Sequence, residues 1–288
     1  MAILRTEGLT YVYGEGTPFV RQAITDVTLD IEEDTLYALI GHTGSGKSTL
    51  VQHLNGLIRA TSGKIYLDGV DIWAEPKKIR DVRFKVGLVF QYPEYQLFDE
   101  TVAKDIAFGP KNLGLDENEI KERVEWASEV VGLSKELLEK SPFDLSGGEK
   151  RRAAIAGVLA MKPKILILDE PTAGLDPKGR DRLLDGIAAY RKENKTTVIL
   201  VSHSMEDVAR VADKVIVMNG GKVEMTGTTG EVFSQAERLT DIGLNVPMIT
   251  RVMQQLRARG ANVPSDVLTV EQARDILVGL RQGGDGLC

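Results

Sequence analysis

Residues 41–48, Gly-His-Thr-Gly-Ser-Gly-Lys-Ser, have the types and spacing that suit phosphate binding. They match the pattern GxxxxGK[ST], in which glycines let backbone N–H groups point at phosphate oxygens. In this pattern Lys47 reaches the β- and γ-phosphates, and the Ser48 hydroxyl binds Mg²⁺. The residues expected to contact a nucleotide are Gly41, His42, Thr43, Gly44, Ser45, Gly46, Lys47, Ser48 and Thr49. We call residues 41–48 the phosphate loop.

The segments on either side of the phosphate loop support this interpretation. Residues 36–40 are an apolar run that predicts a strand, and residues 49–54 are typical of a helix. Strand, glycine-rich loop and helix is the context in which the pattern binds phosphate, because the helix N-terminus adds the positive end of its dipole. An ordinary glycine turn is the alternative. The loop therefore predicts a nucleoside triphosphate site, without saying what the triphosphate is used for.

Two acids follow a second apolar run. Residues 165–168 are Ile-Leu-Ile-Leu, which predicts a buried strand, and Asp169 and Glu170 come directly after it. Asp169 is expected to hold the Mg²⁺ that bridges the phosphates, and Glu170 to accept a proton from the attacking water. Taken alone, the pair is equally consistent with surface acids at a strand end. The phosphate loop upstream favours the catalytic interpretation.

A third motif, Leu-Ser-Gly-Gly-Glu at residues 145–149, precedes a basic, helix-forming stretch. Ser146 is a good N-cap, and Gly147 and Gly148 leave backbone N–H groups free to meet an anion. This loop cannot reach the chain's own phosphate loop if it belongs to a separate helical unit. We therefore expect it to close over the nucleotide of another copy or of a sister chain. A flexible Ser-Gly-Gly turn is the alternative.

Strand-like and helical patterns alternate along most of the chain, which predicts an α/β nucleotide-binding core within residues 1–235. The expected strands are residues 28–31, 36–40, 64–67, 86–90, 165–168, 197–201 and 214–218, and the expected helices after the phosphate loop are 117–131, 148–160, 178–192 and 204–212. Residues 99–160 are mostly helical and are expected to form an inserted subdomain. Residues 236–288 are expected to form a C-terminal extension. Their apolar pattern fits either a small appended unit or completion of the core.

Composition narrows the classes of function. A net charge of −6 and a pI near 5.3 provide no basic surface for nucleic acid. The single cysteine, Cys288, allows no disulfide framework and no cysteine metal site. We see no signal peptide and no apolar run long enough to span a bilayer. A cytoplasmic location is expected, and any work at a membrane requires another chain to span it.

The order of these motifs across residues 1–235 resembles that of ABC-type ATPases. Residues 41–48 match the Walker A loop, 165–170 match Walker B with its catalytic glutamate, and 145–149 match the ABC signature. We call residues 145–149 the signature loop. The resemblance implies a P-loop NTPase fold of the ABC type, in which a mixed sheet is flanked by helices, with ATP and Mg²⁺ as ligands.

The same resemblance assigns further residues. Gln91 matches the glutamine that touches Mg²⁺ and the attacking water, and His203 matches the histidine that contacts the γ-phosphate. Tyr13 stands where the family stacks an aromatic ring on adenine, although an ordinary core or loop tyrosine is an alternative. The expected catalytic residues are Glu170, His203 and Gln91, and the expected Mg²⁺ ligands are Ser48, Gln91 and Asp169.

The signature loop departs from the family at its last position. The usual residue there is Gln, whereas this chain has Glu149. A carboxylate near a partner's γ-phosphate is electrostatically unfavourable. We therefore expect Glu149 to face outward, leaving Ser146 and the glycine N–H groups to contact the phosphate.

Longer stretches resemble the ATPases of energy-coupling factor (ECF) importers for vitamins and transition-metal ions. They are residues 41–47, 52–56, 90–98 and 108–112, and residues 141–144 point to the second, A-prime type of these paired ATPases. The resemblance implies a heterodimer with a sister ECF ATPase, bound to a transmembrane T component that holds a substrate-binding S component. It also implies a peripheral location on the cytoplasmic face of the cell membrane, with the C-terminal extension joining the two ATPases.

The surface near residues 91–100 is expected to bind the membrane partner. Glu94, Asp99 and Glu100 lie among apolar residues there, which predicts a docking site for an Arg-bearing helix of the T component. Two alternatives stay open. The chain could be the ATPase of a conventional ABC transporter, or a soluble ABC ATPase acting in repair or translation. Repair ATPases are disfavoured because Lys47 and Ser146 are too close for a long coiled-coil insertion. Translation ATPases are disfavoured because they carry two cassettes in one chain, whereas one is expected here.

Overall fold

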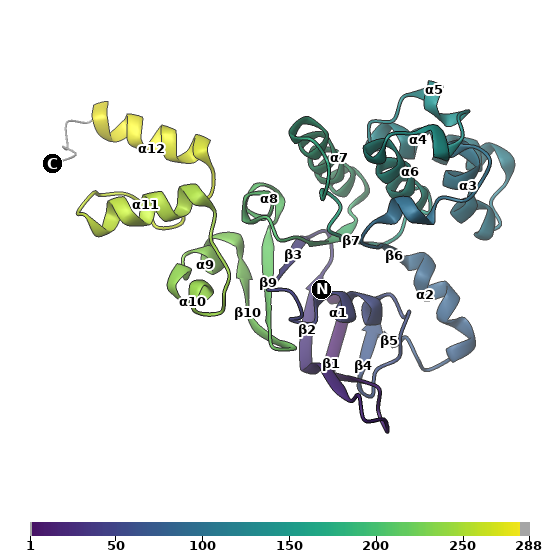
Figure 1. Ribbon diagram of the computed structural model, residues 1–288, viewed down its shortest axis with the longest axis horizontal. Helices are drawn as coiled ribbons and strands as arrows, with labels where there is room; N and C mark the ends of the chain where they lie inside the picture. Colours follow the sequence, from purple (N-terminus) through teal and green to yellow (C-terminus); the bar gives the residue numbers. More distant parts are fainter. Residues whose placement is uncertain (1, 283–288) are drawn as a thin grey trace.

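Two β-sheets form the centre of the computed structural model, which describes residues 2–282 (Figure 1). Cys288 lies outside the described residues. The larger sheet has six strands in the order β10-β9-β3-β8-β7-β6. Its strands are β3 (Leu36–Ile40), β6 (Val86–Val89), β7 (Ile165–Asp169), β8 (Thr197–Val201), β9 (Lys214–Asn219) and β10 (Lys222–Thr228).

The six-stranded sheet is mixed. Strands β6, β7, β8, β3 and β9 run parallel to one another, and β10 is antiparallel to β9. Every residue of β3, β7 and β8 is buried, which is the pattern of central parallel strands covered on both faces. The predicted fold class, an α/β core with a mixed sheet flanked by helices, is confirmed.

The smaller sheet is antiparallel, with the order β2-β1-β4-β5. Its strands are β1 (Ala2–Tyr13), β2 (Arg21–Glu32), β4 (Ser62–Leu67) and β5 (Val70–Asp71). Helix α1 (Lys47–Leu54) lies between the two sheets, where Leu50, Val51 and Leu54 pack against residues of both. Strand β1 was not predicted, and β2 is longer than the predicted strand at residues 28–31.

A layer of helices lies beside the six-stranded sheet, beyond β6 (Figure 1). Helix α2 (Ile79–Lys85) leads into β6, and the layer itself consists of α3 (Val102–Asn112), α4 (Glu117–Val130), α5 (Lys135–Leu138) and α6 (Gly147–Leu159). Helix α4 begins where the Asp116 side chain accepts hydrogen bonds from the N–H groups of Asn118 and Glu119. We call α3–α6 the helical layer. Residues 102–159, all of them described, contain no strand.

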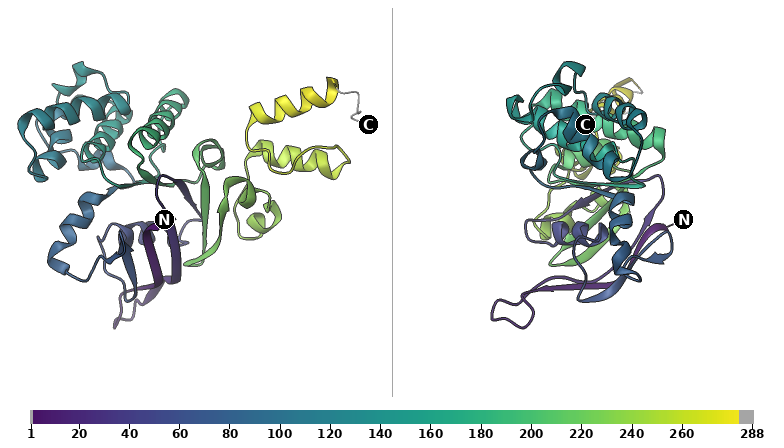
Figure 2. Two further views of the ribbon diagram at one scale, coloured as in Figure 1. Left: turned by 180° about the vertical axis from the view of Figure 1, so that it is seen from behind. Right: turned by 90° about the vertical axis from the view of Figure 1, so that its right-hand side faces the viewer.

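Helices α7 (Pro177–Asn194) and α8 (Met205–Val211) follow β7 and β8 and pack on the larger sheet. After β10 come α9 (Thr229–Phe233), α10 (Ala236–Asp241), α11 (Met248–Ala258) and α12 (Val270–Gln282). Helices α9 and α10 complete the core against β9 through Val232, Phe233 and Leu239. Helices α11 and α12 pack on each other and project away from the sheets (Figure 2). Within residues 2–282 no helix has the length and apolar character needed to cross a membrane.

Candidate functional site

The phosphate loop joins β3 to α1 and packs tightly between two other strands. A Cβ atom at Gly41 would lie 2.4 Å from the Met218 carbonyl oxygen of β9. At Gly46, where φ is 100°, a Cβ atom would lie 2.7 Å from the Ala23 carbonyl oxygen of β2. Glycine is therefore required at both positions, because any side chain would collide with backbone atoms.

Lys47, the first residue of α1, is only 7% exposed. Its Nζ donates hydrogen bonds to the carbonyl oxygens of Gly41 at 2.7 Å and His42 at 3.1 Å. Burial lowers the pKa of Lys47, and the nearby carboxylates of Glu170 and Asp169 oppose this shift. The loop thus holds a partly desolvated cation beside two acids, an arrangement that fits an anionic ligand bound together with a metal ion.

Asp169 and Glu170 lie at the carboxyl end of β7, two strands from the phosphate loop. Parallel strands β3, β8 and β7 end at the same edge of the sheet, which brings their following residues together. Burial raises the pKa of Asp169, while a hydrogen bond with Ser48 and the charge of Lys47 lower it. Ser48 and Asp169 are therefore neighbours, as two oxygen ligands of one Mg²⁺ must be.

Glu170 has the properties of a general base. It adopts a left-handed backbone conformation, with φ at 54°, which is a strained position for a residue other than glycine. Burial, followed by the charge of Asp169, raises the pKa of Glu170 to about 7. Its Oε1 lies 3.2 Å from Nε2 of His203, which follows β8. A carboxyl group with a pKa near neutrality is suited to accept and release a proton.

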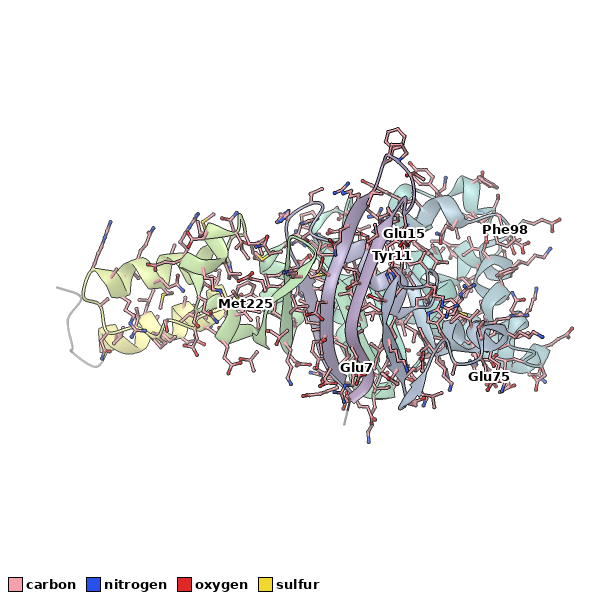
Figure 3. The ribbon with its side chains drawn as sticks, turned by 90° about the horizontal axis from the view of Figure 1, so that it is seen from below. Glu7, Tyr11, Glu15, Glu75, Phe98 and Met225 are labelled. Atoms are coloured by element: carbon pink, nitrogen blue, oxygen red, sulfur yellow. The ribbon has the colours of Figure 1, made fainter. Side chains whose placement is uncertain are left out.

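Tyr13 lies at the end of β1, over the start of α1. A cavity of about 180 Å³ is lined by Tyr13, Arg21, Ala23 and residues 44 and 46–49. The Tyr13 hydroxyl is 3.3 Å from Oγ1 of Thr49. Its ring meets Tyr11 edge-on, with centroids 4.8 Å apart, and Tyr11 meets the buried His53 at the same distance. Tyr11 and Glu15 lie near the same end of β1, and Glu7 lies towards the other end (Figure 3).

Arg21 is the charged lining residue of this cavity that was not predicted from the sequence. It pairs with Tyr13 across the β1–β2 ladder, and its Nη2 would lie 3.5 Å from a Cβ atom built at Gly44. No motif marks Arg21, and only the pairing of two strands brings it to the phosphate loop. Its guanidinium adds a second cation beside Lys47 on the wall of this cavity.

Two parts of the predicted site, Gln91 and the signature loop, lie apart from the phosphate loop. Gln91 follows β6 at the edge of the sheet; its side chain is exposed, and within the described residues it forms no hydrogen bond with the loop or with Asp169. Ser146 caps α6, and Gly147 and Gly148 begin it. Helix α6 packs against α3, α4 and β6. The assigned roles of Gln91, Ser146 and the two glycines stay predictions.

Glu149 does not face outward as expected. Its Oε2 accepts hydrogen bonds from the Ser146 N–H at 2.8 Å and the Ser146 hydroxyl at 2.6 Å, and the Glu149 N–H donates to Ser146 Oγ at 3.4 Å. This is a capping box, in which N-cap and third helical residue satisfy each other's donors. The signal, Ser-x-x-Glu before a helix, was present in the sequence.

Glu94 is already paired within the chain. This corrects the expectation that Glu94 receives an arginine from a helix of the T component. Its two carboxylate oxygens accept from Nε and Nη2 of Arg151 at 3.0 and 2.8 Å. The Arg151 side chain is 4% exposed and the Glu94 side chain 18%. Glu94 therefore joins the segment after β6 to α6 within the chain.

Comparisons with known proteins agree with this fold. Residues 24–173 match the family model described as ABC transporter. The ATP-binding protein EcfA2 of an energy-coupling factor transporter from Caldanaerobacter subterraneus subsp. tengcongensis is 58% identical over 280 residues, covering 97% of this chain and 98% of the relative.

Two solved structures are similar as well. CbiO1 from Clostridium perfringens, described as part of the ABC transporter complex cbiONQ, has a TM-score of 0.74 and 40% identity, covering 88% of this chain and 99% of that chain. A dimeric ATP-binding cassette bound to ADP and Pi has a TM-score of 0.72 and 26% identity, covering 78% of this chain and 98% of that chain. The chain therefore belongs to the ABC transporter family and, within it, to the ATP-binding proteins of energy-coupling factor transporters.

Proposed function

We propose that this chain hydrolyses ATP to drive an ECF importer that takes up vitamins or transition-metal ions. The observation that carries the proposal is the meeting of Lys47, Asp169, Glu170 and His203 at one edge of the sheet. A buried cation, a metal-binding carboxylate and a base with a pKa near 7 are the groups that triphosphate hydrolysis needs.

Each residue has a distinct part in this proposal. Lys47 and the loop N–H groups bind the phosphates, and Ser48 and Asp169 supply oxygen donors that fit Mg²⁺, which would neutralise charge on the β- and γ-phosphates. Glu170 takes a proton from the attacking water. His203, held against Glu170 at 3.2 Å, contacts the γ-phosphate. In this proposal Gln91, at the edge of the sheet beside the helical layer, contacts Mg²⁺ and the attacking water. It thereby links the helical layer to the nucleotide site.

The catalytic unit proposed here contains two ATPase chains. The signature loop leads into α6 of the helical layer, which supports a role for Ser146, Gly147 and Gly148 at the ATP of a sister chain. The similarity to a dimeric cassette bound to ADP and Pi supports such a sandwich. The projecting α11 and α12 carry exposed apolar side chains at Met248, Val252, Val270 and Val278, which we propose contact the sister chain.

A groove beside the helical layer is the proposed docking site for a transmembrane T component, itself bound to an S component. The groove has a volume of about 390 Å³ and lies between α2, α3 and α6. Its lining is largely apolar, with Phe84, Leu97, Phe98 and Phe108, and Phe98 is 60% exposed. An exposed aromatic patch of this kind favours a protein partner. Docking there would hold the chain peripherally on the cytoplasmic face of the membrane.

Replacing Phe98 with Asp is expected to release the membrane partners without weakening ATP binding. The carboxylate would be desolvated in an apolar groove that lies away from the phosphate loop. The measurement is co-purification of integral membrane proteins with the tagged chain, together with ATP-driven uptake in vesicles. Val70→Asp, at a position 63% exposed on the smaller sheet, is the matched control. This variant should keep both the co-purifying membrane proteins and ATP-driven uptake. Wild-type protein that brings down no membrane partner would contradict the proposed function.

Arg21→Ala is expected to raise the Kd for ATP about tenfold, the cost of one charge-assisted contact, with little change in kcat at saturating ATP. The guanidinium lies over the phosphate loop, away from Glu170. Nucleotide titration by fluorescence or calorimetry measures the change. Arg5→Ala is the control, because Arg5 forms only surface ion pairs with Glu7 and Asp30 on the same sheet. Equal affinities in the two variants would exclude a nucleotide contact for Arg21.

A further inference from the structure

Ser146 carries two hydrogen-bond donors at the N-terminus of α6, its backbone N–H and its hydroxyl. Both donate to the same atom, Oε2 of Glu149, at 2.8 and 2.6 Å. The N-terminus of α6 therefore already holds an anion, and that anion belongs to the chain itself. A γ-phosphate offered by a sister chain would have to displace it.

The carboxylate of Glu149 is held in place as an ion. Its hydrogen bonds from Ser146, with further help from the charges of Arg152 and Lys140, keep the pKa of Glu149 below its usual range. The N-terminus of α6 adds the positive end of the helix dipole, which also favours negative charge. Glu149 is consequently charged at neutral pH, and it competes for the same donors and the same local field that would attract a phosphate.

A glutamine at this position would behave differently for a simple reason. Its amide oxygen can cap the Ser146 N–H as the carboxylate does, so the helix start is preserved. The amide has no net charge, however, and its NH₂ group can donate to a phosphate oxygen. The difference between the two residues at this site is therefore electrostatic rather than structural.

We propose that Glu149 is a built-in competitor of the γ-phosphate, which slows ATP-driven closure and hydrolysis at the composite site formed with this chain's signature loop. The affected composite site uses the sister chain's phosphate loop and Ser146 of this chain. This inference rests on the proposed two-chain sandwich.

The test uses the complete complex with its sister ATPase and membrane partners. Glu149→Gln is expected to raise kcat for ATP about two- to fivefold at low ionic strength, through better stabilisation of the transferred phosphate. The gain should shrink as salt is added, because screening weakens the repulsion between carboxylate and phosphate. Glu122→Gln is the control and should leave kcat and its salt dependence unchanged. Glu122 is an exposed glutamate of α4. It precedes Arg123, which donates to the Ala160 carbonyl oxygen at the opposite end of α6 from the signature loop.

Ser146→Ala, alone and combined with Glu149→Gln, distinguishes failure of the two-chain sandwich from failure of the competitor role of Glu149. Ser146→Ala should lower kcat, and in its background the gain from Glu149→Gln should be largely lost, because the contested serine is gone. If Ser146→Ala leaves kcat unchanged, the two-chain sandwich itself is wrong. If Ser146→Ala lowers kcat but Glu149→Gln leaves it unchanged or lowers it, the sandwich stands and the competitor role of Glu149 is overturned. Thermal unfolding of each complex checks that all variants are folded.

Discussion

Replacing Glu170 with Gln is expected to reduce ATP turnover by about 10²- to 10³-fold while ATP still binds. The amide has the size of the carboxyl group but cannot accept the proton of the attacking water. The environment of Glu170 suits it to act as the general base. Burial and the charge of Asp169 raise its pKa to about 7, and its side chain touches His203. Phosphate release and equilibrium ATP binding, measured on the same purified complex, give the two quantities.

The control for Glu170→Gln is Glu193→Gln, an exposed position on α7. This variant should turn over ATP at the wild-type rate. Binding of ATP by Glu170→Gln should be as tight as in the wild type or tighter, because the bound nucleotide is no longer consumed. A Glu170→Gln complex that retains more than about a tenth of wild-type turnover would exclude Glu170 as the general base.

Replacing Glu94 with Ala is expected to lower the free energy of unfolding by about 3–5 kcal/mol, the usual cost of leaving a buried charge without its partner. Arg151 is 4% exposed and gives Glu94 two hydrogen bonds. The Tyr92 ring, whose centroid lies 5.7 Å from the Arg151 guanidinium carbon, stays beside the unpaired guanidinium. Denaturant titration or calorimetry of the isolated chain measures the loss.

The control for Glu94→Ala is Glu100→Ala, which removes an exposed ion pair between Glu100, which precedes α3, and Lys104 of α3. Exposed pairs of this kind contribute little to stability, so its Tm should not change measurably. Similar Tm values for the two variants would show that the Glu94–Arg151 pair does not stabilise the fold. The Glu94–Arg151 pair also affects how transport assays of Glu94 variants are interpreted. Loss of uptake in a Glu94→Lys variant would report damage to α6 packing as well as any loss of docking.

The central strands could be predicted from sequence, whereas the strands at the edges could not. Strands β3 and β8 have the predicted bounds, because each is a continuous apolar run buried on both faces. Strand β1 mixes buried and half-exposed residues and was missed, as was β10. Such strands are stabilised by pairing with distant neighbours, as β1 is by β2 and β4, and propensity alone identifies them poorly.

The sequence by itself determined the phosphate loop, the acids after β7 and the N-cap at Ser146, because each depends on residues within a few positions of one another. Local rules of glycine geometry and helix capping act at that range. Only the tertiary structure decided that Arg21 lies over the phosphate loop and that Glu94 pairs with Arg151. Strand pairing and helix packing bring these residues together across long stretches of chain, and no short pattern encodes such a contact.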